Sequence, residues 1–487
     1  MNILGVEVVK NYINGRWVES KAKETQDVIN PATGELLAKT PMSTREETLQ
    51  AIEAGMAAFA RWRATPALTR VRHLNRIRDA FEENFEELSK ILTMEQGKAL
   101  DESRGEYRRT IENLECATSV PSLQMGYNTE DIASGIDEMV IKQPLGVFFC
   151  VAPFNFPGMV PTWFWPFAIG CGNTYIVKPS PQVPMSQVKQ FEIIHELGLP
   201  KGVMNMIHGG PEAVNALLES PDTVGMSFVG STRVGKLLYK KAGEQGKRAQ
   251  VQGGAKNFLT VMPDANLERT VPALLTSFFG CAGQRCLSGA VLLAVGEIYE
   301  PLKKAVVEGA KNIIVGYGLE EGVQMGPMAS KQGMDNVLGF IDKGIEEGAD
   351  LLLDGRGIQI PGYEEGFFIG PNIFADVKPT MTIAREEIFG PVMSIIPVKG
   401  LDEAIDIIHA NRYGNASSVF TTSGKTARDY QYRVKAGNIG INIGVAAPIA
   451  TFPFSGMKDS FLGDLHGQGQ DAVSFFTENK VVITRWF

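Results

Sequence analysis

Through roughly the first 120 residues of the chain, apolar residues recur at the three- to four-residue spacing of amphipathic helices. Residues 43–47 form a capping box, in which a hydroxyl residue and a glutamate satisfy backbone N–H groups at the start of a helix. The apolar residues from 71 to 88 predict a longer helix that ends near Gly97, and residues 100–118 predict a third. Before these helices, residues 12–17 have the pattern of a hairpin.

Beyond residue 126 the pattern changes to short apolar runs that alternate with helical segments. The predicted strands are 138–141, 147–152, 174–178, 204–207, 224–228 and 475–482, with helices near 163–169, 188–197 and 213–218. This alternation predicts a parallel sheet with helices on both faces. Ligands bind such sheets beyond the carboxyl ends of the strands. Three loops at those ends are therefore candidate binding loops: 153–157, 178–180 and 230–235.

The stretch from Gln143 to Val177 carries no charged residue and contains several aromatic ones. A membrane-spanning helix needs about 20 uninterrupted apolar residues, whereas prolines interrupt this stretch at positions 153, 157, 161 and 166. We therefore expect a buried strand, a turn, a short helix and another strand here, and no membrane partner.

Composition narrows the class of protein further. A chain of 487 residues suggests two or three domains, and 44% apolar with 21% charged residues is ordinary for a soluble globular enzyme. The net charge of -8 argues against nucleic acid as a partner. The five cysteines include no CxxC pair and the five histidines no HExxH, so we expect no disulfide framework and no metal site. Without a signal peptide at the N-terminus, a reducing, cytoplasmic location is expected.

Residues 230–236 match GxxxxGK, the phosphate-binding loop of nucleoside triphosphatases. That motif needs Ser or Thr next, because the hydroxyl binds magnesium, but Leu237 follows here. What remains is a glycine turn from a strand into a helix, whose N-terminus can hold a diphosphate. The GxGxxG dinucleotide fingerprint is absent, so this loop alone identifies no cofactor.

Cys286 lies in a polar turn inside an otherwise apolar segment, residues 278–288. A free thiol is only a few per cent ionised at pH 7, so a nucleophilic cysteine needs neighbours that favour the thiolate. Gly283 and Arg285 lie just before Cys286, and no acid lies within several residues. A buried cysteine that serves only as a small apolar side chain is the simpler interpretation. The segment by itself does not decide between the two.

Six segments, in this order, resemble the aldehyde dehydrogenase superfamily: PFNFP at 153–157, KPS at 178–180, FVGSTRVG at 228–235, GQRC at 283–286, EIFGPV at 387–392 and PFSGMK at 453–458. The resemblance runs from Tyr12 to Val482. It implies an α/β, aldehyde dehydrogenase-like fold with three parts. They are a Rossmann-like cofactor-binding domain (1–125 and 145–253), an α/β catalytic domain (254–469) and a small β oligomerisation element (126–144 and 470–487).

The resemblance also implies roles for individual residues. Cys286 would attack the aldehyde carbon, and the Asn155 amide with the backbone N–H of Cys286 would hold the oxyanion. The residues implied for NAD binding are Phe154, Lys178, Gly230, Ser231, Glu387 and Phe389, although a solvated or ion-paired acid is the simpler interpretation of Glu387. Pro181 stands where many NAD-preferring relatives place a glutamate, so NADP remains an alternative cofactor. Projecting strands need a partner chain, which predicts a homodimer or homotetramer.

One departure from the superfamily bears on how the product is released. Most members that release a free acid carry a glutamate in an ELGGK segment, and the corresponding residue here is Gln252. An amide cannot take a proton from water. Residues 254–257 resemble the coenzyme A-acylating methylmalonate-semialdehyde dehydrogenase branch, which lacks that glutamate. The resemblance implies a small carboxylated aldehyde, methylmalonate or malonate semialdehyde, as substrate and an acyl-CoA as product.

That branch uses two arginines for the substrate carboxylate, at positions that match Arg109 and Arg285. Arg285 is also expected to favour the thiolate of Cys286, while Arg104 and Arg108 are expected on a solvated face. The alternative is a hydrolytic NAD(P)-dependent aldehyde dehydrogenase, for which Glu387 is the one motif acid available as a base. An acyl-transfer or nucleotide-hydrolysing enzyme and a non-catalytic scaffold are further alternatives.

Overall fold

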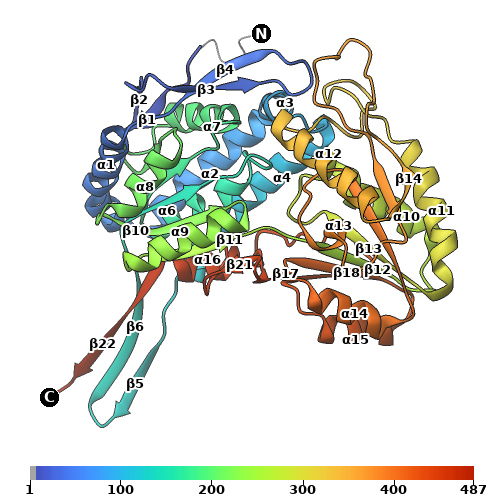
Figure 1. The fold of residues 1–487 in the computed structure, drawn as a ribbon. Helices are drawn as coiled ribbons and strands as arrows, with labels where there is room; N and C mark the ends of the chain where they lie inside the picture. Colours follow the sequence, from blue (N-terminus) through green and yellow to red (C-terminus); the bar gives the residue numbers. More distant parts are fainter. Residues whose placement is uncertain (1–6) are drawn as a thin grey trace.

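Two sheets, each with its own hydrophobic core, organise the chain in the computed structural model, which describes residues 7–487 (Figure 1). The first sheet has the order β2 (Arg16–Val18), β1 (Asn11–Ile13), β9 (Met204–Met206), β8 (Thr174–Lys178), β7 (Val147–Val151), β10 (Thr223–Val229), β11 (Arg248–Gln252) and β21 (Phe461–Leu462). The strands from β9 to β11 are parallel. The hairpin predicted at residues 12–17 is confirmed as β1–β2.

Helices cover both faces of the first sheet, because its central strands are apolar on both sides. In β7, Val147 and Phe149 pack into one core cluster and Phe148 and Cys150 into another. The helices are α1 (Arg45–Ala64), α2 (Ala67–Glu83), α3 (Phe85–Gln96), α4 (Leu100–Ala117), α5 (Val120–Leu123), α6 (Trp165–Cys171), α7 (Met185–Glu196), α8 (Pro211–Glu219), α9 (Thr232–Glu244) and α16 (Gly469–Phe475), with the 3-10 turn η1 (Val160–Trp163).

The capping box is confirmed at Thr44 and Glu47, which begin α1. The single helix predicted from residue 71 to Gly97 is wrong, because the chain breaks at Asn84 into α2 and α3. The Asn84 side chain donates to the Ala80 carbonyl at 2.8 Å and so competes with the helical backbone. The second helix does end at Gly97, whose φ of 99° suits glycine.

The charge-free stretch folds as predicted, into β7, the turn η1, the short helix α6 and β8. None of the helices within residues 7–487 combines the length and the apolar character that crossing a bilayer requires.

The second sheet has the order β14 (Asp350–Leu353), β15 (Asn372–Ala375), β16 (Val392–Val398), β13 (Gly289–Val295), β12 (Asn257–Val261), β18 (Ala416–Phe420) and β19 (Asn438–Ile441), parallel except at β14. Its helical segments are α10 (Leu267–Phe279), η2 (Gly280–Gly283), η3 (Gly296–Ile298), α11 (Tyr299–Lys311), α12 (Lys331–Glu346), α13 (Thr382–Arg385), α14 (Leu401–Ala410) and α15 (Gly424–Arg433). Two-stranded pairs join β3 (Thr25–Ile29) to β4 (Leu36–Pro41) and β17 (Tyr413–Gly414) to β20 (Met457–Lys458).

A three-stranded arm projects away from the first sheet (Figure 1). It consists of β5 (Asn128–Ala133), β6 (Ile136–Pro144) and β22 (Thr477–Arg485), with β22 antiparallel to β6. The last strand begins two residues later than predicted, because Phe475 ends α16. Strand β21, which lies within the segment assigned from sequence to the catalytic domain, pairs with β11 in the first sheet.

Candidate active site

The carboxyl ends of the parallel strands in the first sheet all lie at one edge of that sheet, and the predicted binding loops follow them. The strand order reverses between β7 and β10. Strands β8 and β9 are added on one side of β7, whereas β10 and β11 are added on its other side. Such a reversal opens a crevice in which α/β sheets bind ligands. The loop at 153–157 follows β7, Lys178 ends β8, and Gly230 and Ser231 follow β10, so the three predicted binding loops meet at this crevice.

Lys178 lies almost fully buried at the end of β8. Its Nζ donates to the carbonyl oxygens of Pro179 at 2.7 Å and Gly209 at 3.1 Å. Burial lowers the pKa of this ammonium to about 8. Lys178 therefore places a fixed donor at the crevice.

The turn after β10 leads directly into α9. Ser231 is the N-cap of this helix, and its Oγ accepts from the Val234 N–H at 3.4 Å. A Cβ at Gly235 would lie 2.7 Å from the Val251 side chain, so the glycine lets α9 pack closely on β11. The exposed first turn of α9 can hold an anion, and the arrangement fits a dinucleotide diphosphate.

The second sheet faces the site with the amino ends of its strands. Cys286 lies three residues before β13, and Glu387 lies five residues before β16. The turn before Cys286 has three successive residues with positive φ: Cys281 at 50°, Ala282 at 51° and Gly283 at 70°. A Cβ on Gly283 would overlap the Gly390 carbonyl. Glycine at this position therefore lets the two motif segments pack against each other.

Two side-chain amides fix the backbone at Cys286. Asn257 Nδ2 and Asn415 Nδ2 each donate to the Cys286 carbonyl oxygen at 2.8 Å. Asn257 also donates to the Ser288 carbonyl at 2.7 Å and accepts from the Ala416 N–H at 3.0 Å. Sequence reasoning missed both roles. The sequence shows only that each asparagine lies at the start of an apolar strand, and this does not indicate which group its side chain binds.

Asn155 lies beside the same segment from the opposite side. Its side chain is 5% exposed, and its Nδ2 donates to the Gln284 carbonyl at 3.0 Å. An amide nitrogen carries two hydrogens, so one N–H remains for another acceptor. The structure thus brings together Asn155 and Cys286, which lie far apart in the sequence.

The electrostatic environment of Cys286 differs from the one expected. Burial raises the pKa of this half-buried thiol to about 12, and the negative charge of Glu387 adds to the increase. Arg285 acts in the opposite direction but with a smaller effect. The charge of Arg285 thus favours the thiolate of Cys286, as expected, but burial and the charge of Glu387 outweigh it.

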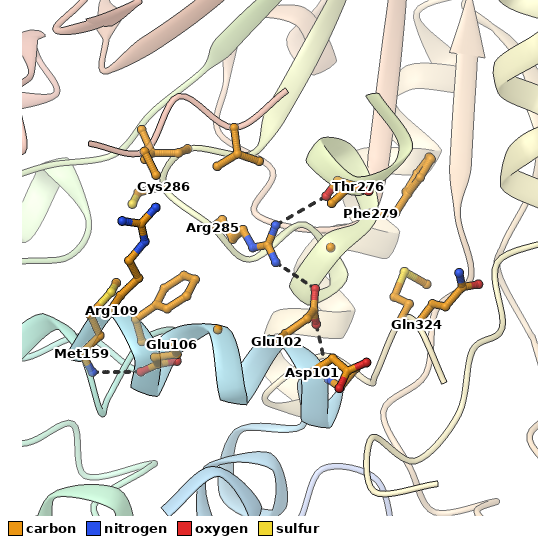
Figure 2. A pocket seen from close by; sticks show the side chains of 18 of the residues that line it. Asp101, Glu102, Glu106, Arg109, Met159, Thr276, Phe279, Arg285, Cys286 and Gln324 are labelled. Atoms are coloured by element: carbon orange, nitrogen blue, oxygen red, sulfur yellow. Dashed lines mark hydrogen bonds and ion pairs between the residues drawn. The ribbon is translucent and has the colours of Figure 1, made fainter. Parts of the chain in front are cut away.

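Arg285 is engaged by other groups (Figure 2). One guanidinium nitrogen pairs with Glu102 Oε1 at 2.9 Å, and Nε lies 3.2 Å from Cys281 Sγ. Glu102 Oε1 also accepts from the Cys281 N–H at 2.6 Å. Glu102 therefore neutralises Arg285 and holds the turn that leads to Cys286. Sequence gave no signal for this contact, because Glu102 lies on α4.

Arg109, also on α4, lies on the side of the cavity where Cys286 lies (Figure 2). Its guanidinium pairs with Glu112 at 2.8 Å, and both side chains are about one third exposed. Arg104 and Arg108 pair with acids at the exposed surface, as expected for a solvated face. Of the three arginines on this helix, Arg109 alone lines the cavity.

The cavity has a volume of about 710 Å³ and reaches Cys286, Arg109 and Arg285. Aromatic side chains form part of its wall: Phe156, Trp163 and Phe454. Ligand sites typically combine such an apolar lining with a few polar groups. Within residues 7–487, no three His, Cys, Asp or Glu side chains are grouped so that they could hold a metal ion.

Glu387 contacts the loop that follows β11, and its charge acts on the Cys286 thiol. Its Oε1 accepts from the Ala255 N–H at 2.8 Å, and burial raises its pKa to about 7. Burial lowers the pKa of the neighbouring Lys256 to about 7. Phe389, with a φ of 58°, makes an edge-to-face contact with Phe154 at 5.8 Å between ring centres, so two predicted cofactor residues meet.

Gln252 ends β11 and is buried. Its Nε2 donates to the Phe454 carbonyl at 2.8 Å, and its Oε1 accepts a hydrogen bond from none of the described residues. The side chain is thus a neutral amide bound to the backbone of Phe454, a residue that lines the cavity.

The model of the aldehyde dehydrogenase family matches residues 17–482. The chain belongs to this family. Malonate-semialdehyde dehydrogenase 2 of Geobacillus kaustophilus is 45% identical over 482 residues, which are 99% of each chain. The malonate-semialdehyde dehydrogenase of Halalkalibacterium halodurans is 43% identical over the full length of both.

Solved structures agree with this assignment. Methylmalonate-semialdehyde dehydrogenase from Oceanimonas doudoroffii has a TM-score of 0.97 at 39% identity, with 99% of each chain covered. A Sinorhizobium meliloti protein complexed with NAD also has a TM-score of 0.97, at 37% identity and the same coverage. The predicted family and α/β fold are confirmed.

Proposed function

We propose that the enzyme oxidises malonate or methylmalonate semialdehyde with NAD and transfers the acyl group to coenzyme A. The observation that carries this proposal is the buried amide of Gln252, at the position where hydrolytic relatives have a glutamate. A neutral amide cannot activate water, so the acyl group must wait for a stronger nucleophile. The semialdehyde named for the relatives at 43–45% identity supports the choice of substrate.

In the proposed reaction, Cys286 loses its thiol proton to solvent, and the thiolate Sγ bonds to the aldehyde carbon to give the oxyanion of a thiohemiacetal. The oxyanion accepts from the second N–H of the Asn155 amide and from the backbone N–H of Cys286, and one such donor typically contributes about 2.7–4 kcal/mol. When the oxyanion collapses, the carbon loses a hydride and Cys286 carries a thioester. The thiolate of coenzyme A then attacks the thioester carbon and expels Cys286 as the leaving group.

The residues at the crevice fit a nicotinamide dinucleotide, which when bound supplies the hydride acceptor. Lys178 would hydrogen-bond the adenosine ribose, and Ser231 with Gly230 would hold the diphosphate. Glu387 would hold the nicotinamide ribose, with Phe154 and Phe389 beside it. No carboxylate stands at Pro181 to repel a 2′-phosphate. Rates with NAD and NADP at equal concentration would settle the preference, and we expect NAD.

Arg109 is the better candidate for the substrate carboxylate, because its pair with Glu112 is about one third exposed, whereas the pair of Arg285 with Glu102 is more deeply buried and harder to break. Arg109→Ala should raise KM for malonate semialdehyde far more than KM for a simple aliphatic aldehyde. Arg104→Ala, one turn earlier on the exposed face, is the matched control and should change neither. Equal losses on both aldehydes would remove Arg109 from the substrate site.

Hydrolysis is the second candidate function, and one observation favours it. The charge of Glu387 acts on Cys286, and a carboxylate with a pKa of about 7 suits a general base. Purified enzyme given malonate semialdehyde and NAD, with and without coenzyme A, separates the two. A rate of NADH formation that is unchanged without the thiol would refute the acyl-CoA route. No aldehyde-dependent NADH at all would favour a non-redox enzyme or a scaffold.

We also propose that the enzyme is a dimer or tetramer with the arm as the oligomerisation element, and that the three-part division of the chain applies except for β21 and α16, which pack with the first sheet. Exposed apolar side chains on the arm support this: Met139, Ile141, Val481 and Ile483. The strand edges of such an arm need a partner. Light scattering of the protein and of an Ile483→Lys variant should show loss of the oligomer in the variant, and an unchanged mass would refute the assignment.

A further inference from the structure

A buried ion pair lies behind the loop that carries Asn155. Lys98 Nζ and Glu106 Oε2 are 2.6 Å apart, and neither side chain is exposed. Removing two charges from water costs more than their mutual attraction usually returns, so such a pair is weak evidence for a purely stabilising role. The remaining contacts of the pair indicate what else it does.

Both partners bind the backbone of residues 155–159. Lys98 Nζ donates to the Asn155 carbonyl at 2.7 Å and lies 3.8 Å from the centre of the Phe156 ring. Glu106 Oε1 accepts from the N–H groups of Gly158 at 2.8 Å and Met159 at 3.0 Å, the latter drawn in Figure 2. One ion pair thus holds the loop at both ends.

Neutral side chains hold the middle of the loop. Gln187 Nε2 donates to the Pro157 carbonyl at 2.8 Å, and Gln190 Nε2 donates to the Gly158 carbonyl at 2.9 Å. Neither glutamine bonds to Asn155. Among these side chains, Lys98 is the one that bonds to the backbone of Asn155 itself, and its position is fixed by Glu106.

We propose that Lys98 and Glu106 are positioning residues that orient the Asn155 amide toward the oxyanion. The proposal rests on the role of Asn155 in the proposed function. A preorganised donor works only where the oxyanion forms, and a displacement of about 1 Å at such a site can cost about 10²-fold in rate. The charged hydrogen bonds of the pair restrain the loop more tightly than neutral ones would.

The test combines Lys98→Met and Glu106→Gln with Asn155→Ala. Each single variant should lower kcat about 10- to 100-fold while KM for NAD changes less than about 2-fold. In the Asn155→Ala background the same changes should cause no further loss, because the amide they position is gone. Lys247→Met is the matched control, since Lys247 Nζ also donates to buried backbone carbonyls, those of Ser220 and Thr223, but at the amino end of β10, opposite to the end that faces the site. It should leave kcat unchanged in both backgrounds.

Losing one partner of a buried pair can unfold a protein, so the double variant Lys98→Met/Glu106→Gln is measured too, with thermal unfolding of every variant. The positioning role would be overturned if the Lys98 or Glu106 changes lowered kcat as much in the Asn155→Ala background as in the parent. It would also be overturned if the folded Lys98 and Glu106 variants kept the parental kcat. If Asn155→Ala itself retained the parental rate, the proposed function would fail instead, so the two failures are distinguishable.

Discussion

The two sheets contribute to the site from opposite ends. In the first, the functional residues follow the strands: Lys178 ends β8, and Ser231 follows β10. In the second they precede the strands: Cys286 comes before β13 and Glu387 before β16. A residue after a parallel strand lies in a loop next to a helix N-terminus, where anions bind. A residue before a strand has no such helix, and here side-chain amides fix its backbone.

The difference extends to electrostatics. The first sheet offers an ammonium and a helix N-terminus, which favour the negative charge of a dinucleotide. The second offers a thiol and a carboxylate whose pKa values are both raised by burial. Burial lowers the pKa of Lys178 on the first sheet as well, so shifted pKa values occur on both sheets. What distinguishes the second sheet is a thiol, which can form a bond to an aldehyde carbon. We therefore infer that binding belongs mainly to the first sheet and bond-making to the second.

The largest effect that would test this division is expected from Cys286→Ala. Removing the nucleophile should lower the rate of NADH formation by about 10⁴-fold or more, while the affinity for NAD, measured by fluorescence titration, stays within about 2-fold. Cys116→Ala, which removes a buried thiol from α4, is the control and should keep both values. A Cys286→Ala enzyme that still oxidised aldehyde would end the assignment of the nucleophile.

The converse change on the first sheet is Lys178→Met. Hydrogen bonds to charged groups contribute about 1.5–3 kcal/mol, so KM for NAD should rise about 10- to 100-fold. Alkylation of Cys286 by iodoacetamide reports on the second sheet and should not change. If the alkylation rate fell as much as cofactor binding did, the two sheets would not be separable in function.

A smaller effect concerns pH and the charge of Glu387. Because the pKa of Cys286 is raised to about 12, its thiolate fraction, and with it the alkylation rate, should rise about tenfold per pH unit between pH 7 and 9. Glu387→Gln removes a negative charge, which lowers the pKa of Cys286 and should speed alkylation several-fold at pH 8. At pH 6 the difference should vanish, because Glu387, with a pKa of about 7, is then mostly protonated.

Glu386→Gln provides the matched control for that experiment, since Glu386 is the adjacent glutamate and pairs with Arg412 at the surface. It should leave the alkylation profile unchanged. Equal acceleration by both variants would mean that general surface charge, and not Glu387, acts on the thiol.

Sequence reasoning succeeded where a local pattern decides the structure. The alternating apolar runs located β7 to β10 within one or two residues, because burial on both faces leaves a continuous apolar signature. The break at Asn84 was missed, since it depends on one side-chain bond to Ala80. The pattern of Arg285 beside Cys286 was visible, but its pairing with Glu102, 183 positions away, was not.

The supports of the site were the least predictable part. Neither the Asn415 amide on the Cys286 carbonyl nor the Lys98–Glu106 pair behind Asn155 follows from local spacing. Asn415 lies 129 positions from Cys286, and Lys98 lies 57 positions from Asn155, so these contacts form only when distant segments pack together. The residues that react can be found from motifs, whereas those that orient them require the fold.

The smallest predicted effect compares the two amides on the Cys286 carbonyl. Asn257→Ala removes three hydrogen bonds, those to Cys286 and Ser288 and the one from Ala416. Asn415→Ala removes the bond that its Nδ2 donates to Cys286. The Asn415 Oδ1 accepts a hydrogen bond from none of the described residues. At a net value of about 0.5–1.5 kcal/mol per bond, Asn415→Ala should lower kcat about 2- to 10-fold and Asn257→Ala more. Both should leave KM for NAD unchanged, because neither amide is among the residues proposed to hold the cofactor. Parental kcat in both folded variants would show that the position of Cys286 is not set by this pair of amides.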